Sequence, residues 1–166
     1  RNYKLMIKQL SVKNFKSHAS TELLLSKINL LTGLNGMGKS SIIQVLLLLR
    51  QTYQKNMLSA GLELKDDLCN IGVARDALYQ SATNDLIYFS ITDENSQPYS
   101  WSFKVDDKKL LDTFLKLHNP KPNFSSVLQK MSLFNKKFQY ISAFRNGPSQ
   151  DYEKDTSRVE LFHQIS

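Results

Sequence analysis

The chain has 166 residues, and 22 Lys and Arg against 15 Asp and Glu give it a net charge of +7. With 41% hydrophobic and 22% charged residues, it has the composition of a globular domain, which excludes a disordered tail, a collagen-like fibre and a coiled-coil rod. This length predicts a single domain over residues 1–166. The one cysteine, Cys69, cannot form an internal disulfide, which indicates a reducing compartment, and we expect it to be buried.

Positive charge is concentrated at the start of the chain. Five basic residues precede the first acidic one, Glu22; they are Arg1, Lys4, Lys8, Lys13 and Lys16. This excess favours a polyanion, either nucleotide phosphates or nucleic acid, while a solvated surface explains it equally well. Since no apolar run is long enough to be a signal peptide or to span a bilayer, we expect a cytoplasmic protein with no membrane partner.

The first third of the chain predicts strands followed by a helix. Residues 5–15 and 22–25 are apolar with polar residues interleaved, which predicts two strands joined at 16–20. The continuous apolar run 28–32 predicts a buried strand that leads into a glycine-rich segment at 33–38. Residues 39–55 then predict a helix buried nearly all round, because its first polar residue after the apolar run is Arg50.

The rest of the chain is less regular. Residues 56–84 show no clear period, and short strands are one interpretation of their scattered apolar residues. Alternation at 86–92 and at 99–105, around a turn at 95–98, predicts a β-hairpin. Helical spacing at 108–118 and 124–134 predicts two helices, and an apolar run at 138–144 predicts a last strand.

The glycine-rich segment carries the clearest chemical signal. Gly33 to Ser40 match G-x-x-x-x-G-K-[ST], the Walker A phosphate loop, between a predicted strand and a predicted helix. Glycines allow successive backbone N–H groups to surround a phosphate, and the helix that follows points its positive end at the anion. The pattern therefore predicts ATP and Mg²⁺ as cofactors, bound by Asn35, Gly36, Met37, Gly38, Lys39, Ser40 and Ser41.

Three side chains of this loop have separate expected roles. Lys39 should reach the β- and γ-phosphates as a positive charge, and the Ser40 hydroxyl should be a ligand of Mg²⁺. Ser41 is placed to donate to the α-phosphate. The only metal ligand that the sequence predicts is therefore Ser40.

The residues around the loop also resemble a known group. Val12-Lys13-Asn14-Phe15-Lys16-Ser17, followed by Leu31-Thr32-Gly33-x-Asn35-Gly36-x-Gly38-Lys39-Ser40-Ser41, is similar to the amino-terminal signature of ABC-class ATPases of the chromosome-maintenance, RecF and OLD branch. The resemblance implies an α/β fold, in which a mixed β-sheet surrounds the phosphate-loop helix and carries an antiparallel hairpin layer. It also implies a homodimer, with DNA as a further partner. It nominates Lys16 as a nucleotide contact, with Lys13 and Ser17 as weaker candidates, and a solvated lysine as the alternative.

A second resemblance lies near the end of the chain. Residues 140–148 are similar to a Tyr-x-x-x-x-Arg-x-Gly-Pro segment in ATPases of the OLD-like group, some of which act in phage defence with nuclease or other effector proteins. This resemblance leaves Arg145 as a candidate phosphate contact and Gln150 as a candidate magnesium contact, with an ordinary turn as the alternative to both.

Hydrolysis requires more than the phosphate loop. Asp93-Glu94 after an apolar run imitates a Walker B motif, but the polar face of that run favours the hairpin. We therefore expect the Walker B and signature motifs to lie beyond Ser166, and this chain to bind ATP without turnover. A nucleotide-gated dimerisation or DNA-clamp module and a small P-loop kinase are the alternatives. The histidines are isolated in sequence and are expected to be surface or structural residues; they are His18, His118 and His163.

Overall fold

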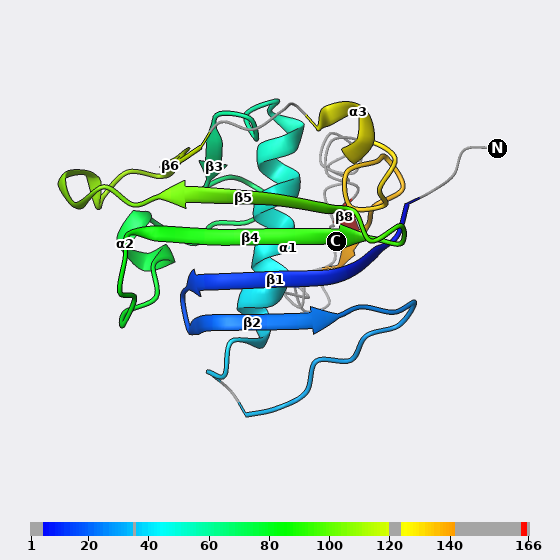
Figure 1. Ribbon diagram of the computed structural model, residues 1–166, viewed down its shortest axis with the longest axis horizontal. Coiled ribbons are helices and arrows are strands. Elements are labelled where there is room, and N and C mark those ends of the chain that lie inside the picture. Colours follow the sequence, from blue (N-terminus) through cyan, green and yellow to red (C-terminus); the bar gives the residue numbers. More distant parts are fainter. Residues whose placement is uncertain (1–4, 35, 120–123, 142–163, 166) are drawn as a thin grey trace, which may run out of the picture.

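The computed structural model describes residues 5–34, 36–119, 124–141 and 164–165. Its main element is a six-stranded sheet with the strand order β2-β1-β4-β5-β6-β3 (Figure 1). The strands are β1 Ile7–Phe15, β2 His18–Leu24, β3 Gly61–Glu63, β4 Leu86–Asp93, β5 Pro98–Lys104 and β6 Phe114–Leu117. The helices are α1 Lys39–Gln54, α2 Ala74–Ala77 and α3 Ser125–Leu128, with a 3₁₀ turn η1 at Asp107–Lys109.

Every strand pair in this sheet is antiparallel. The chain contains both helices and strands, so the expected α/β class holds. The expected mixed sheet is wrong for these six strands, because all of their pairs are antiparallel. Among the strands that the structure describes, β7 Tyr140–Ile141 and β8 Gln164–Ile165 are the one parallel pair, as a separate two-stranded sheet. The hairpin connections of an antiparallel sheet need only short turns, and β1–β2 and β4–β5 have them.

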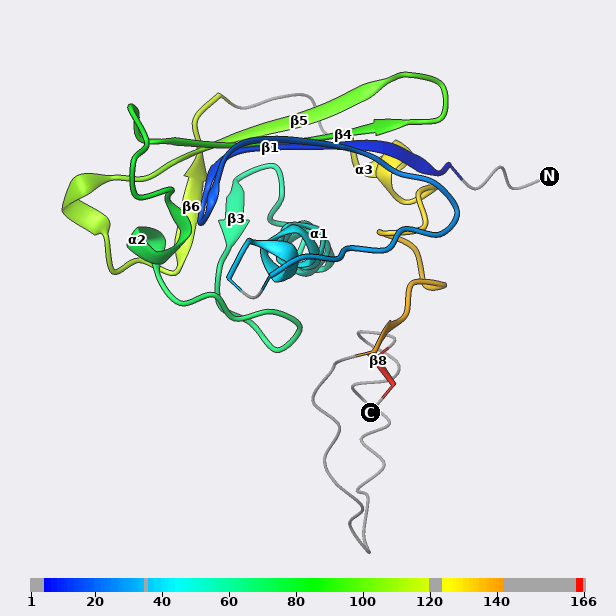
Figure 2. The ribbon, with the colours of Figure 1, turned by 90° about the horizontal axis from the view of Figure 1, so that it is seen from below.

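The core lies between the sheet and α1, which packs against one face (Figure 2). Alternate residues of β1, β4 and β5 point toward α1, and the rings of Phe15, Phe89 and Phe103 form a row with centroid distances of 5.1 and 5.6 Å. The other face of these strands carries Ser11, Lys13, Tyr88 and Ser102, none of which is buried. One apolar and one polar face per strand is the pattern from which the β4–β5 hairpin was predicted, and that prediction is confirmed.

Helix α1 is confirmed nearly to its predicted bounds, but its burial differs along its length. Near its start Ile43 is 42% exposed, whereas Arg50, Gln51 and Thr52 near its end are almost completely buried. The Gln51 side chain donates to the Glu63 carbonyl, and the Thr52 hydroxyl accepts from the Glu63 N–H. These polar residues are buried because they satisfy the backbone of the short edge strand β3.

Residues 28–32 are not a buried strand, which corrects the prediction from their apolar run. Ile28 is 87% and Leu30 is 84% exposed, and no described strand pairs with this segment. A continuous apolar run becomes a strand only when neighbouring strands and cover on both faces are present. The described residues supply neither here, so the segment runs as an exposed connection from β2 to α1 (Figure 1).

Three predicted elements in the second half are changed. Residues 108–118 form the end of η1 and strand β6, not a helix, because Phe114 to Leu117 pair with β3 and β5. Residues 124–134 contain only the one-turn helix α3. Of the strand predicted at 138–144, β7 covers residues 140–141, and residues 142–144 lie outside the described part of the chain.

Asp93 closes the β4–β5 hairpin. Its carboxylate accepts hydrogen bonds from the N–H groups of Asn95 and Gln97 and from the Tyr99 hydroxyl. Burial, together with this carboxylate, raises the pKa of Tyr99. Asp93 is 3% exposed, whereas Glu94 points into solvent. The Asp-Glu pair is thus a turn, as the hairpin interpretation predicted.

We expect Asp93→Ala to lower the free energy of unfolding by about 2 kcal/mol, because three hydrogen-bond donors lose their acceptor. Glu94→Gln is the matched control and is expected to have no effect. Urea denaturation of both variants measures the difference. Equal stability of the two variants would contradict the role of Asp93 as a turn cap.

Candidate functional site

The segment between β2 and α1 has the backbone of a tight, glycine-dependent loop. Gly33, Gly36 and Gly38 have φ angles of 139°, 84° and 86°, a region that side chains with a Cβ rarely adopt. Gly38 is the N-cap of α1. The chain therefore wraps around the start of the helix in a form that requires glycine at three of its positions.

The start of α1 is open to an anion. Its first turn contains no acidic residue, and no described side chain caps it. Ser40 is exposed, and Ser41 is half-buried. Free N–H groups and the positive end of the helix dipole at this point favour a bound negative charge.

Lys39 lies across the loop. Its ammonium donates to the carbonyl oxygens of Gly33 and Leu34, at 2.6 Å each. In this conformation the lysine, at the end of the loop, is hydrogen-bonded to the residues at its beginning. The same charge is within the loop that would receive a phosphate.

The β1–β2 turn forms one side of the loop. Asn14 and Lys16 have φ angles of 55° and 50°, which let the chain reverse direction around Phe15. Phe15 is fully buried and anchors the turn in the core. The Ser17 side chain then lies against the loop, since a Cβ at Gly38 would be only 2.5 Å from its Oγ.

Lys16 is held toward α1. Its ammonium donates to Gln44 Oε1 at 2.9 Å, and its backbone N–H donates to the Ala77 carbonyl. Gln44 lies one helical turn beyond Ser40, so the two side chains share a face of α1. Burial lowers the pKa of Lys16, with smaller opposing effects from Cys69 and Asp76. A nearby anion would favour its charged form.

His18 also contacts the loop. Its Nε2 lies 3.0 Å from the Gly38 carbonyl oxygen, and its Nδ1 lies 2.9 Å from the Thr21 hydroxyl. The side chain is 9% exposed. His18 is therefore a structural residue, as expected, but not an isolated one. His118 is exposed, and His163 lies outside the described residues.

The structure thus brings together most of the predicted site. Gly36, Met37, Gly38, Lys39, Ser40 and Ser41 surround the start of α1, and Lys16 and Ser17 lie beside it. Lys13 does not, because it points to the open face of the sheet, 5.9 Å from the centre of the Tyr88 ring. Asn35, Arg145 and Gln150 lie outside the described residues.

The Asp93–Glu94 turn is far from this loop. Asp93 pairs with Ile7 at one end of β1, whereas the loop lies beside the turn after Phe15 at the other end. Eight residues of strand separate these ends by about 26 Å.

Within the described ranges, no three His, Cys, Asp or Glu side chains come together as a metal site.

Sequence reasoning missed two residues of the site. Gln44 and His18 follow no motif: Gln44 occurs in an apolar helical run, and His18 is an ordinary residue at the start of a strand. Only the fold shows that Gln44 receives the Lys16 ammonium and that His18 holds the loop. The motif predicts glycine at position 38, but it does not show that the His18 ring occupies the space beside this glycine.

Cys69 is 7% exposed, which confirms the expectation of a buried cysteine, and this burial raises the pKa of its thiol to about 11.

In the part of the chain that the structure describes, no helix has the length and apolar character needed to cross a bilayer.

Comparison with known proteins gives one family match. A family model described as an AAA ATPase domain matches residues 6–76, which include β1, β2, the glycine loop and α1. No curated protein matches the chain. Over these residues, which contain the glycine loop, the chain is similar to an AAA ATPase domain.

Proposed function

We propose that the chain binds ATP with Mg²⁺ at the loop Gly33–Ser41 and the start of α1. One observation carries this proposal: three glycines with positive φ lead into a helix end that has no acidic residue in its first turn, and Lys39 lies across them. Backbone N–H groups would surround the β-phosphate, and Lys39 would neutralise the β- and γ-oxygens. The residues present fit this cofactor, because they offer donors and a cation to an anion.

Mg²⁺ would be held by Ser40 together with phosphate oxygens and water. Magnesium keeps several waters and is bound in nucleotide sites by few protein ligands, so a single hydroxyl is a sufficient protein contribution. Lys16 would add a second positive charge from the β1–β2 turn, oriented by Gln44. The charge of the metal would help to neutralise the phosphates.

The test is isothermal titration of the chain with Mg-ATP and, separately, with AMP. Because the loop should bind the β- and γ-phosphates, we expect heat of binding from ATP and far weaker binding of AMP. Equal affinity for both nucleotides would show that the phosphate chain is not recognised, and absence of binding would overturn the proposed function.

Ser40→Ala is expected to remove most of the gain in ATP affinity that Mg²⁺ provides, about tenfold, and to leave the affinity in EDTA unchanged. Ser41→Ala is the matched control. Its hydroxyl is placed for the α-phosphate, so its loss should weaken ATP binding equally with and without Mg²⁺. Titrations of both variants in the two buffers measure this. A Mg²⁺ response that survives in Ser40→Ala would exclude Ser40 as the ligand.

The proposal is binding rather than turnover. In the described residues, the Asp-Glu pair that could act as a Walker B motif closes a hairpin at the far end of β1. We place the chain in an ABC-class ATPase of the RecF or OLD kind, on the resemblance of residues 12–17 and 31–41. On the same resemblance we propose a homodimer that acts on DNA.

A nucleotide-gated dimerisation module remains the second candidate, because it needs the same loop but no hydrolysis. Sedimentation velocity of the chain with and without Mg-ATP tests the module. Self-association that requires ATP would support it, and an unchanged sedimentation coefficient with ATP bound would exclude it for this chain.

A further inference from the structure

The His18 imidazole joins β2 to the phosphate loop. A carbonyl oxygen can only accept, so Nε2 must carry the proton that binds the Gly38 oxygen. In the neutral ring Nδ1 is then an acceptor, and the Thr21 hydroxyl donates to it. The Gly38 carbonyl thus fixes the tautomer, and the Thr21 hydroxyl, which can donate or accept, holds the ring through its other nitrogen. Both residues belong to β2, whose pairing with β1 fixes their position.

The Gly38 carbonyl is shared between two donors. Besides His18, it accepts the first helical hydrogen bond of α1, from the N–H of Ile42 at 3.2 Å. The carbonyl therefore keeps a partner if His18 is lost, so the histidine is not needed to satisfy a buried group. Its contribution is to the direction in which this peptide unit points.

That direction decides where a loop N–H points. The carbonyl of Gly38 and the N–H of Lys39 belong to one planar trans peptide, so they point in opposite directions. His18 and Ile42 hold the oxygen toward the sheet and the helix. The N–H of Lys39 is consequently turned out of the start of α1, toward the position that a phosphate would take.

The ring also explains why position 38 must be glycine. A Cβ at Gly38 would lie 2.5 Å from His18 Nε2, too close for any side chain to be accepted without movement of the ring. Glycine thus allows both the positive φ of the N-cap and the direct approach of the histidine.

We propose that His18 is a positioning residue of the phosphate loop: with its ring held by Thr21, it orients the Gly38–Lys39 peptide so that the Lys39 N–H is ready for a phosphate. This inference rests on the proposed function, since it assigns the residue that prepares that site. His18 itself does not contact the nucleotide.

The test compares His18→Phe with His18→Gln by titration with Mg-ATP. Phenylalanine keeps a ring of similar size but has no donor, whereas glutamine keeps an N–H that can reach the Gly38 oxygen. We expect His18→Phe to weaken ATP binding about two- to tenfold, the range of one neutral hydrogen bond, and His18→Gln to restore most of the loss. Urea denaturation should show that the two variants are equally stable.

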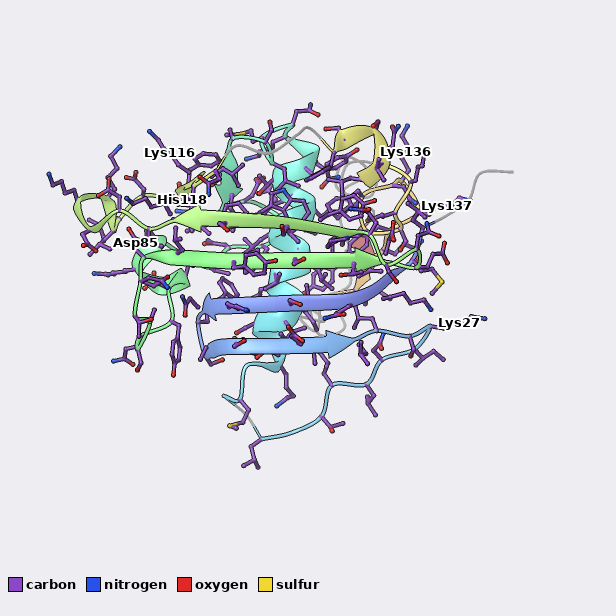
Figure 3. The ribbon with its side chains drawn as sticks, viewed as in Figure 1. Lys27, Asp85, Lys116, His118, Lys136 and Lys137 are labelled. Carbon is purple, nitrogen blue, oxygen red and sulfur yellow. The ribbon has the colours of Figure 1, made fainter. Side chains whose placement is uncertain are left out.

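Thr21→Val serves as a second variant, because it leaves the ring in place and removes only the hydroxyl. It should weaken ATP binding in the same direction as His18→Phe. His118→Phe is the matched control. His118 is exposed and directly follows β6, which lies toward the opposite edge of the sheet from β2 (Figure 3). This control variant should bind ATP as the wild type does.

The failures of the two proposals are distinguishable. If the wild-type chain does not bind Mg-ATP, the proposed function fails. If the wild type binds while His18→Phe and Thr21→Val bind equally well, only the positioning role is overturned. Loss of binding in His18→Gln to the same degree as in His18→Phe would also overturn it, because the donor would then be irrelevant.

Discussion

Replacing Lys39 with alanine is expected to weaken Mg-ATP binding by about 30- to 150-fold. Among the loop residues that the structure describes, the Lys39 ammonium is the cation that hydrogen bonds fix, through the carbonyls of Gly33 and Leu34. A hydrogen bond to a charged group in such a site contributes about 2–3 kcal/mol, which converts to that range of affinity. The alanine also releases the loop, so the remaining N–H groups would be less well arranged for a phosphate.

Isothermal titration with Mg-ATP measures this effect, and Lys27→Ala is the matched control. Lys27 is an exposed lysine in the same connection between β2 and α1, and its side chain points away from the molecule (Figure 3). The Lys27→Ala substitution removes one positive charge and leaves the contacts of Lys39 with the loop unchanged. Equal weakening by both variants would show that net charge, not the position of Lys39, attracts the nucleotide. Unchanged affinity in Lys39→Ala would exclude the loop as the phosphate site.

The parts of the fold that could be predicted are those determined by nearby residues. The run from Gly33 to Ser40 predicts its own conformation, because the glycines permit the positive φ angles that the loop has. The alternation in β4 and β5 predicts which face is buried, and the composition of residues 95–98 predicts the turn. Helix α1 follows from a long apolar run that starts at a defined N-terminal signal.

The parts that could not be predicted depend on distant partners. The apolar segment at 28–32 and the stretch at 108–118 each carry a pattern that suits burial, but the pattern does not name a neighbour. In the described structure Phe114 to Leu117 find β3 and β5 and become a strand, whereas Ile28 and Leu30 find no partner and stay exposed. Tertiary pairing decides both cases against local preference.

The residues of the candidate site likewise fall into those that nearby sequence reveals and those that only the fold brings together. Lys39, Ser40 and the glycines are adjacent in sequence, so a motif reveals them. Lys16 enters by resemblance, and the structure adds Gln44 as its partner. His18 is 20 residues from Gly38 in the chain and meets it only because the β1–β2 hairpin folds over the start of α1.

Arg50 is another residue whose environment the sequence does not show. It follows the apolar run of α1, where a charged side chain would mark the solvent-facing end, yet it is 1% exposed. Its guanidinium donates to the carbonyls of Leu133 and Asn135 and lies 4.4 Å from the centre of the Phe138 ring. Burial lowers its pKa to about 10, so the group remains charged at neutral pH. Within the described ranges no carboxylate pairs with it.

We expect Arg50→Ala to reduce the free energy of unfolding by about 3 kcal/mol. The substitution leaves a cavity at the end of α1 and removes the donor from two carbonyls, and these losses exceed the gain from no longer burying a charge. The segment 133–138 would lose the hydrogen bonds that attach it to α1 and keep the ring contact of Phe134 with Tyr53.

Arg50→Met separates the contributions to this loss. Methionine fills much of the same volume and carries no charge to desolvate, so only the hydrogen bonds and the stacking on Phe138 are lost, at about 1–2 kcal/mol. Arg50→Lys keeps the charge but cannot match the planar fork, and should be less stable than Arg50→Met because an ammonium is harder to desolvate. Urea denaturation of the three variants measures the order Met, Lys, Ala. A lysine variant as stable as the wild type would mean that charge alone, rather than the guanidinium geometry, holds residues 133–138 against the helix.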